Sequence, residues 1–427
     1  MITSGERPLI GAADGVVWSG CACDSRRMTS VSPDALIERA RESTGLTELG
    51  SHHFHPFLHA WCADLAAPHL SEVGRARLAK LAVRNLETRL RIEELLRRYP
   101  QIEQVPLPRI VRIGGFPRSG TTLLHQLMSL PRDRRALLRW ELVAPLPPPV
   151  ASAYLDDPRI AMVGAALDAL RGSDLARMHW VEATEPEECT WGFVDLTGLL
   201  GRGCLSVMPR WTELLYGSGL GHRDTYVEYR RLLQILLWRN PLPTGGTLVL
   251  KSPTDTDSLP AFLDVFPEAT AVLIHRDPFR TVTSSCQIQR VINQAFVAGE
   301  APLDDAGLAT LMLAVHARLA DAMVALSHSH PERVTNLRYA DLMAGPPAAV
   351  TDLAHRLELA EVPSATRVLV DAFLETQRAG TRAAPPAAYS DFGLTPEGVH
   401  AESSLSRYMA EFHVATEHDR TTAPARA

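Results

Sequence analysis

The sequence predicts an α/β protein whose parallel sheet carries helices on both faces. Short apolar runs at 110–113, 247–250, 271–274 and 334–337 have the length and composition of buried strands, and a helical pattern follows each of them. Strands that alternate with helices in this way build parallel sheets. Amphipathic stretches before residue 100 add N-terminal helices, and helical patterns between 157 and 239 are inserted between the first two strands.

The composition limits the class of protein. The 427 residues suffice for one large domain or two smaller ones, and 46% hydrophobic with 22% charged residues is typical of globular proteins. A formal charge of −6 without a basic block argues against a nucleic-acid partner. We find no apolar run near the roughly 18 residues of a membrane helix and no signal-peptide pattern, so we expect no transmembrane segment. The six cysteines are sparse and irregularly spaced, which fits a reduced, cytoplasmic protein.

The N-terminal part begins with helical patterns from Ser32 onward, where a serine precedes a proline and an acidic residue. His55, His59 and Cys62 share one face of the next helical stretch, which raises the alternative of a metal site. The apolar residues around them favour an amphipathic helix with histidines on its rim. No fourth ligand or HExxH pattern accompanies them, so we expect a structural role.

A domain boundary is expected near residue 105. Residues 74–100 form a long amphipathic pattern, and a proline-rich stretch then leads into the first strand. We therefore predict an N-terminal, mostly helical segment of residues 1–105 that packs on a main domain of residues 106–427. The motifs of that domain lie within 109–345.

The stretch 109–130 is central to the prediction. An apolar strand runs into a turn with Gly115 and Gly120, which tolerate backbone conformations that a Cβ resists, and a helix begins at Thr121. Main-chain N–H groups and the helix dipole make such a helix start an anion site. The glycine spacing imitates the P-loop of nucleotide triphosphatases, but the lysine after the second glycine is missing and Arg118 is the cation inside the loop. A P-loop-like, three-layer core with a different ligand is indicated.

Residues 116–124, Phe-Pro-Arg-Ser-Gly-Thr-Thr-Leu-Leu, resemble the 5′-phosphosulfate loop of sulfotransferases that use 3′-phosphoadenosine 5′-phosphosulfate (PAPS). The arginine is similar to the branch that includes tyrosylprotein sulfotransferases and many bacterial members. The resemblance implies PAPS as the sulfuryl donor and a catalytic role for Arg118. The residues implied to bind the donor here are Pro117, Arg118, Ser119, Gly120, Thr121 and Thr122.

Motifs at the ends of later strands extend the resemblance. Lys251, one of only two lysines in the chain, matches the family's catalytic lysine. The resemblance implies that Lys251 binds the donor and that Ser252 beside it helps to orient the leaving phosphate. Arg276 and Ser284 stand eight positions apart, the spacing of the family's 3′-phosphate contacts, and Tyr339 matches the tyrosine beside the adenine. Because ligands of parallel sheets bind at the carboxyl ends of the strands, we expect these residues to meet there.

The general base stays open between two carboxylates. Glu141 lies where the arginine-loop branch has its proposed base, and a neighbouring tryptophan would raise its pKa by desolvation. Asp255 is the second candidate, where related bacterial sequences often have a histidine. His125 on the loop helix is expected to pack. The C-terminal Arg-Lys-Gly clamp of the cytosolic branch is absent, which leaves Arg280 or Arg290 to cap the 3′-phosphate.

The resemblance implies an enzyme (EC 2.8.2.-) that transfers the sulfuryl group to a hydroxyl or amine of a small-molecule, carbohydrate or lipid acceptor. The acidic and aromatic stretch from His179 to Trp191 is expected to line the acceptor pocket, with a solvated acidic loop as the alternative. The motifs require no metal, because arginine, lysine and backbone dipoles supply positive charge. A non-catalytic PAPS-binding protein and a P-loop kinase are the alternative functions, and the missing lysine argues against the kinase.

Overall fold

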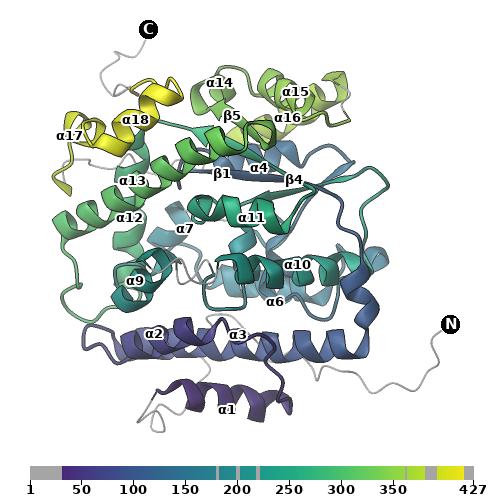
Figure 1. Ribbon diagram of the computed structural model, residues 1–427, viewed down its shortest axis with the longest axis vertical. Helices are drawn as coiled ribbons and strands as arrows, with labels where there is room; N and C mark the ends of the chain where they lie inside the picture. Colours follow the sequence, from purple (N-terminus) through teal and green to yellow (C-terminus); the bar gives the residue numbers. More distant parts are fainter. Residues whose placement is uncertain are drawn as a thin grey trace.

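The fold is built around one sheet, which lies in the upper half of the molecule in Figure 1. The structure is a computed structural model that describes residues 31–178, 182–198, 202–217, 222–360, 363–379 and 392–417. The sheet has five strands in the order β2-β3-β1-β4-β5, and each neighbouring pair is parallel. The strands are β1 Arg109–Gly115, β2 Arg134–Ala136, β3 Thr247–Lys251, β4 Ala269–His275 and β5 Val334–Arg338.

Alternate side chains of the strands face two separate hydrophobic clusters. Ile110 and Leu248 join a cluster with α10, α11, α12 and α13, whereas their chain neighbours Val111 and Val249 join a second cluster with α4, α15 and α16. This alternation follows from the period of two along a strand. The sheet is therefore the middle of three layers, with α10 and α11 on one side and α14 to α16 on the other (Figure 1), and the predicted α/β class is confirmed.

The helices begin and end close to the positions that the sequence patterns indicate. Ser32, the predicted start signal, caps the first helix by accepting a hydrogen bond from the Ala35 amide at 3.2 Å. The α-helices are α1 Pro33–Thr44, α2 His55–Leu65, α3 Glu72–Arg98, α4 Thr121–Met128, α5 Arg139–Val143, α6 Pro158–Asp168, α7 Asp174–Met178, α9 Pro209–Gly217, α10 His222–Trp238, α11 Leu259–Val265, α12 Pro278–Gln294, α13 Asp305–Ser329, α14 Tyr339–Ala344, α15 Pro346–Arg356, α16 Pro363–Ala379, α17 Pro396–His400 and α18 Ser403–Glu411. Short 3-10 turns are η2 Pro100–Gln104, η3 Ala151–Ala153, η4 Cys189–Gly192, η5 Thr256–Ser258 and η6 Pro331–Arg333.

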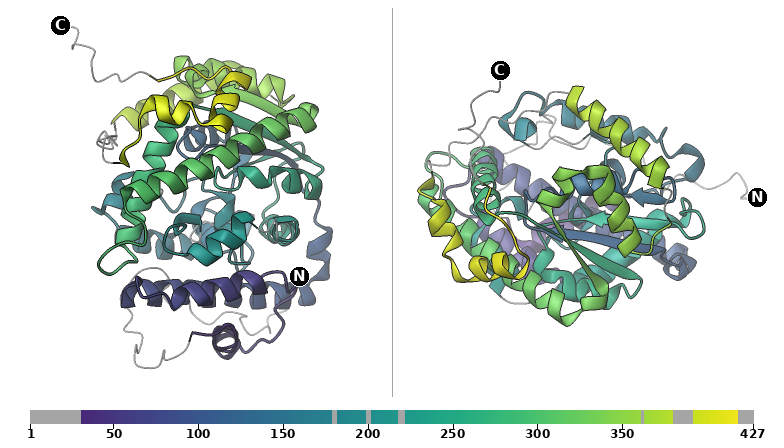
Figure 2. Two further views of the ribbon diagram at one scale, coloured as in Figure 1. Left: turned by 60° about the vertical axis from the view of Figure 1, so that its left-hand side comes forward. Right: turned by 90° about the horizontal axis from the view of Figure 1, so that it is seen from above.

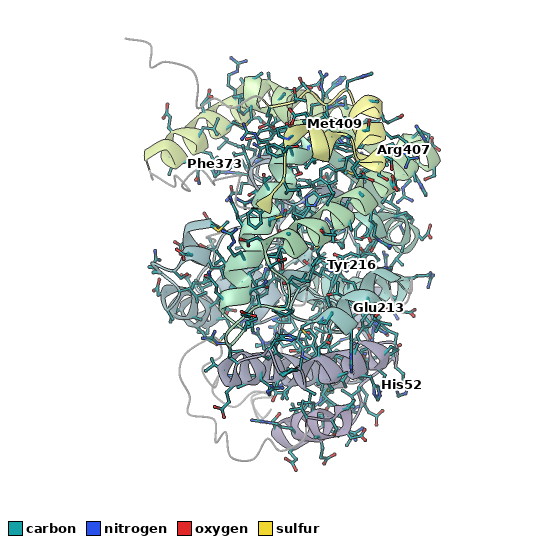
Figure 3. All side chains as sticks on the ribbon, turned by 90° about the vertical axis from the view of Figure 1, so that its left-hand side faces the viewer. His52, Glu213, Tyr216, Phe373, Arg407 and Met409 are labelled. Carbon is teal, nitrogen blue, oxygen red and sulfur yellow. The ribbon has the colours of Figure 1, made fainter. Side chains whose placement is uncertain are left out.

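Helices α1, α2 and α3 form a further layer beneath α10 (Figure 1). Their buried side chains belong to the same hydrophobic cluster as α10 to α13, so this layer packs on the main part of the molecule. His52 lies near it in Figure 3, at the opposite end from Arg407 and Met409 of α18. The boundary at residue 105 stays a prediction, since the cluster continues across it.

The C-terminal helices return to the sheet. Helix α17 contacts α12 and α18 contacts α13, and Figure 2 shows these C-terminal helices, in yellow, beside the green helices of the molecule. Tyr408 of α18 is buried, and its hydroxyl lies 3.3 Å from Nδ1 of His275 at the end of β4. This return path brings the chain up to residue 417 next to the carboxyl end of the sheet.

One helix in the described part of the chain, α13, is long and apolar enough to cross a membrane, with a mean hydropathy of 1.5. The sequence analysis expected no such stretch. In the structure α13 packs between α12 and α18, and its buried residues include Met312, Leu319 and Met323. One side of α13 is thus buried against neighbouring helices, as in an amphipathic helix packed on a protein core.

Candidate active site

The turn between β1 and α4 has an unusual backbone that requires its glycines. Gly115 has φ +140°, Arg118 φ +69° and Gly120 φ +96°, all in the region that disfavours a Cβ. A Cβ on Gly120 would lie 2.7 Å from ring atoms of Tyr339, and one on Gly115 would lie 2.5 Å from the carbonyl oxygen of Ile274. The glycines therefore let the loop pass close to β4 and to Tyr339, which the sequence placed beside the nucleotide.

The residues predicted to bind the nucleotide lie together at this edge. Nε of Arg118 donates to Oγ of Ser284 at 3.0 Å, and Nη1 of Arg276 donates to the carbonyl oxygen of Arg118 at 3.0 Å. The Arg276 guanidinium lies 4.1 Å from the centre of the Tyr339 ring. Burial, together with the neighbouring charge of Arg276, lowers the pKa of Arg118. Two adjacent cations with limited access to water form a receptor for a multiply charged anion such as a nucleotide phosphate.

Lys251 occupies the end of the adjacent strand β3, where it pairs with Ile113 of β1. Its side chain is fully buried, and Nζ donates to Oε1 of Glu188 at 2.9 Å, with Oε1 of Glu187 at 4.0 Å. The following residue, Ser252, is held by a hydrogen bond from its amide to the carbonyl oxygen of Ile113 at 3.2 Å. A buried lysine requires a carboxylate partner, and the two glutamates meet that requirement.

Glu188 is a candidate functional residue that the sequence analysis did not single out. Its Oε2 is buried and has no hydrogen-bond partner among the described residues. Burial raises the pKa of this carboxyl group, although the Lys251 ammonium partly opposes the effect. The Glu188 carboxylate also partly opposes the lowering of the Arg118 pKa, so it interacts electrostatically with the loop as well as with Lys251. The sequence holds four glutamates between residues 182 and 188, and this acidic stretch was predicted only to line the acceptor pocket.

Asp255 is placed in a buried ion pair. Its Oδ1 accepts from Arg112 at 2.5 Å and its Oδ2 accepts from the Tyr226 hydroxyl at 2.8 Å. Burial alone would raise the pKa of Asp255, but the charges of Arg112 and Arg202 hold it below its ordinary value. Both oxygens are engaged, so these contacts favour a structural role beneath the loop over proton transfer.

Glu141 is also buried with both carboxylate oxygens engaged. Oε1 accepts from the Leu138 amide at 2.8 Å and from the Tyr154 hydroxyl at 2.6 Å, and Oε2 accepts from Arg135 at 2.7 Å. The bond to Leu138 closes the first turn of α5, as a glutamate at the third helical position often does. This environment ties Glu141 to the fold of its own segment, and its role as a base stays a prediction.

Three other candidates have structural partners. Nε2 of His125 lies 3.0 Å from the carbonyl oxygen of Val249, and burial lowers the pKa of this histidine to about 3, in keeping with a packing role. Arg290 pairs with Asp305 at 2.8 Å. The role of Arg280 as a cap stays a prediction. Nδ1 of His52 approaches Nε2 of His55 at 3.2 Å, and no group of three or more metal-ligating side chains comes together within the described ranges.

A small cavity of about 50 Å³ lies close to Ser252, which follows β3. The cavity is lined by α2, α3, α5, Pro145 and the segment 190–198, and its aromatic side chains are those of Trp61, Trp191 and Phe193. Thr190 lines it as well, and the Thr190 hydroxyl lies 3.4 Å from Oγ of Ser252. Part of the predicted acceptor stretch thus borders an aromatic cavity, whereas His179 and Trp180 lie outside the described residues.

Comparison with known proteins identifies the family. The profile of the sulfotransferase family matches residues 108–363, which is more than half of the chain. The chain belongs to the sulfotransferase family. This membership confirms the resemblance that the loop motif indicated, and it leaves the P-loop kinase alternative without support.

Individual relatives of this sulfotransferase family member are distant. It is 23% identical over 255 residues to the omega-hydroxy-beta-dihydromenaquinone-9 sulfotransferase Stf3 of Mycobacterium bovis, a match that covers 58% of this chain and 62% of the relative. Sulfotransferase STF9 from Mycobacterium avium has a TM-score of 0.79 at 24% identity, with coverage of 92% of this chain and 98% of that one. Sulfotransferase STF1 from Mycobacterium tuberculosis has a TM-score of 0.73 at 21% identity, with coverage of 89% of this chain and 100% of that one. These structures confirm the P-loop-like sulfotransferase fold.

Proposed function

We propose that the protein is a PAPS-dependent sulfotransferase, which transfers the sulfuryl group to a hydroxyl or amine of its acceptor. The observation that carries the proposal is the cluster of Arg118, Arg276 and Ser284 beside Tyr339, next to the buried Lys251. PAPS would supply the sulfuryl group, and adenosine 3′,5′-bisphosphate would be the leaving group. Family membership supports the reaction class.

The chain's own residues divide the work of donor binding. Arg276 and Ser284 would hold the 3′-phosphate, which distinguishes PAPS from ATP, and Tyr339 would contact the adenine. Arg118, Ser119 and the start of α4, Gly120 to Thr122, would hold the 5′-phosphosulfate through a cation and main-chain N–H groups. We propose that no metal is needed, because these groups supply the positive charge at the transferred group.

Lys251 and Glu188 would carry out the transfer step. The Lys251 ammonium would stabilise the negative charge that develops on the bridging oxygen, with Ser252 beside it. Glu188 would accept the proton of the acceptor hydroxyl on its unpartnered Oε2 while the new oxygen–sulfur bond forms. We prefer Glu188 to Glu141 and Asp255, because the oxygens of the latter two already accept hydrogen bonds.

The acceptor is proposed to be an apolar small molecule or lipid that carries a hydroxyl group. The support is the aromatic lining next to Thr190, and the name of the Stf3 relative, which states a menaquinone derivative as its substrate. The cavity is too small for such a molecule without movement of its lining. We further propose a cytoplasmic enzyme, since the described cysteines 62, 189, 204 and 286 are buried free thiols. A bacterial source is supported by the mycobacterial relatives.

The proposal is tested by calorimetric titration with adenosine 3′,5′-bisphosphate, adenosine 5′-phosphate and ATP. Tight binding that requires the 3′-phosphate and is lost in Arg276→Ala is the expected result. Preference for ATP would contradict it. Incubation with PAPS and a panel of hydroxylated apolar acceptors then separates a catalyst from a non-catalytic binding protein, which would bind the donor without forming any sulfated product.

A further inference from the structure

The guanidinium of Arg276 is already bound to an anion of the same chain. Nε donates to Oε1 of Glu417 at 2.7 Å and Nη2 donates to Oε2 at 2.9 Å. This is the two-pronged geometry in which arginine binds carboxylates and phosphates alike. The remaining nitrogen, Nη1, donates to the carbonyl oxygen of Arg118. All three nitrogens of the Arg276 guanidinium therefore have a partner.

The contact depends on the path of the C-terminal segment, residues 392–417. The Tyr408 hydroxyl accepts a hydrogen bond from the Arg276 amide at 3.2 Å, and the Phe412 ring stacks on His275 with centres 3.8 Å apart. Beyond Phe412 the chain is no longer helical, and the Glu417 amide donates to the Asp277 carboxylate at 2.7 Å. The helix α18 is thus anchored at the end of β4, and the residues after it extend over Arg276.

We propose that the Glu417 carboxylate occupies the place of the donor's 3′-phosphate, so that residues 413–417 act as a strap that the nucleotide must displace. The inference rests on the proposed function, in which Arg276 receives that phosphate. A phosphate and a carboxylate do not share one guanidinium fork, because both are anions and both require the same two N–H directions. Binding of the donor and pairing of Glu417 are therefore mutually exclusive.

The position of the pair makes displacement feasible. The side chains of Arg276 and Glu417 are 23% and 31% exposed, so the carboxylate can leave for water without opening the core. Partly exposed ion pairs are weak enough to be exchanged by a ligand with more charge. When only a fraction of the molecules has the fork unoccupied, the apparent affinity for the nucleotide falls by that fraction. The strap would thus lower nucleotide affinity and favour release of the product.

The test compares adenosine 3′,5′-bisphosphate affinity in the wild type and in Glu417→Gln by calorimetry. Removal of the competing charge is expected to tighten binding about fivefold, in line with a partly exposed ion pair. Adenosine 5′-phosphate, which lacks the 3′-phosphate, is expected to bind equally to both proteins. Glu411→Gln is the matched control, because its carboxylate lies in the same segment and pairs with His328 at 2.7 Å.

Two other outcomes overturn the inference. Weaker binding in Glu417→Gln would mean that the carboxylate orients Arg276 for the nucleotide, and equal binding would mean that it does not compete. Failure of the proposed function has a different signature. In that case nucleotide binding by the wild type would not depend on the 3′-phosphate, and Arg276→Ala would bind as tightly as the wild type. The proposal of the strap would then be wrong as well.

Discussion

Glu188 differs from the other candidate bases in its hydrogen bonds. One of its oxygens is bound to Lys251 and the other is buried without a partner among the described residues, whereas Glu141 and Asp255 each use both oxygens within the fold. A base must have a lone pair to offer, and a raised pKa suits proton transfer near neutral pH. Its contact with Lys251 would also join the proposed base to the residue proposed to stabilise the leaving group.

Replacement of Glu188 by glutamine is expected to lower kcat by about 10²- to 10⁴-fold, the usual contribution of a general base. Affinity for adenosine 3′,5′-bisphosphate is expected to stay the same. Because burial raises the pKa of Glu188, the wild-type rate should increase with pH as this carboxyl group loses its proton. Steady-state rates with PAPS over a pH series measure both effects.

The matched control for this prediction is Glu141→Gln, which keeps the size of another buried glutamate. If Glu141→Gln loses turnover and Glu188→Gln keeps it, the proposal of Glu188 as the base is wrong, and Glu141, one of the two bases that the sequence left open, is favoured. Glu141→Gln is suited to this comparison because it removes the charge partner of the largely buried Arg135, as Glu188→Gln removes that of Lys251.

At the level of elements, the loop between β1 and α4 depends on close approach to Tyr339 of α14. Gly120→Ala would place a methyl group 2.7 Å from the ring at a residue with φ +96°. We expect it to weaken adenosine 3′,5′-bisphosphate binding more than about tenfold, since the loop or the ring must move. Gly299→Ala has the same backbone penalty at φ +77° but meets no atom within 4 Å, so it separates strain from the clash.

Titration calorimetry and thermal unfolding of both variants test this prediction. Gly299→Ala is expected to lower stability by about 1 kcal/mol and to leave nucleotide affinity unchanged. Similar affinities in the two variants would show that the distance between the loop and Tyr339 is unimportant for binding.

Elements with a strong apolar period were predictable from sequence. The helix expected at 223–239 is observed as α10 His222–Trp238, and the four expected strands are all present. The fifth strand, β2, was missed because two of its three residues are arginines. These arginines find partners outside the strand: Arg134 donates to the Ala360 carbonyl at 3.1 Å and Arg135 to Glu141. Such pairings are invisible in a local pattern.

In the candidate site, too, features of a local motif were predictable and contacts between distant residues were not. Residues in a short local motif, such as the loop at 116–122 or the pair Arg276 and Ser284, were predicted from their resemblance to the family's motifs, and their roles stay predictions. Glu188 and Glu417 were not, because their importance comes from contacts with Lys251 and Arg276 across the sheet. A sequence shows which residues are charged, but the partner of a buried charge is decided by the folded chain.

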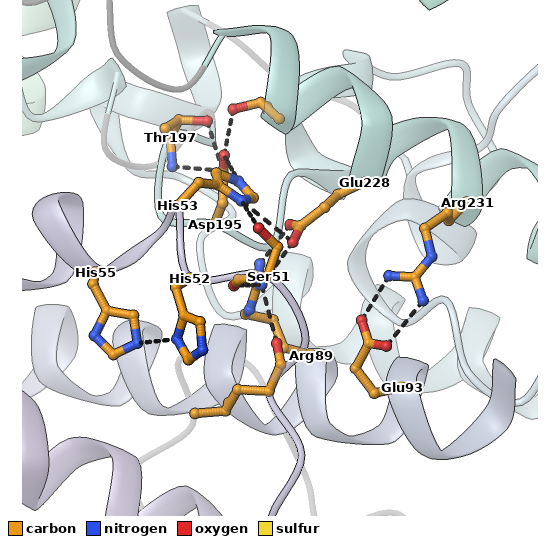
Figure 4. Close-up of polar contacts among 12 residues, drawn as sticks. Ser51, His52, His53, His55, Arg89, Glu93, Asp195, Thr197, Glu228 and Arg231 are labelled. Atoms are coloured by element: carbon orange, nitrogen blue, oxygen red, sulfur yellow. Dashed lines mark hydrogen bonds and ion pairs between the residues drawn. The ribbon is translucent and has the colours of Figure 1, made fainter. Parts of the chain in front are cut away.

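At the level of the whole molecule, a buried polar cluster joins the N-terminal layer to the rest of the protein (Figure 4). Nε2 of His53 lies 3.2 Å from Oδ2 of Asp195, and Arg89 of α3 pairs with Glu228 of α10. Asp195 also accepts a hydrogen bond from the Thr197 amide at 3.0 Å. His53 and Asp195 are both titratable and nearly buried. The strength of their contact therefore depends on which of the two carries a proton.

The contribution of this cluster to the pH dependence of stability follows from the pKa values of His53 and Asp195. Burial alone would lower the pKa of His53, but the bond to Asp195 and the charge of Glu228 raise it above its ordinary value. Burial would raise the pKa of Asp195, but the bond from His53 lowers it to about 2. The stabilisation from His53 is complete below its unfolded pKa of about 6.5 and is lost as pH rises through the folded value. That from Asp195 is present above pH 3.8 and is lost as pH falls toward 2.

His53→Gln is therefore expected to destabilise the protein more at about pH 6 than at about pH 8, so the difference in stability between these two values should change from that of the wild type, since glutamine does not titrate. Urea unfolding at both values measures the free energies. His52→Gln is the matched control: the neighbouring histidine is exposed and bonds only to His55 among the described contacts, so it should keep the wild-type difference. If His53→Gln retains the full difference, the cluster does not couple attachment of the N-terminal layer to pH, and the layer is held by its apolar contacts alone.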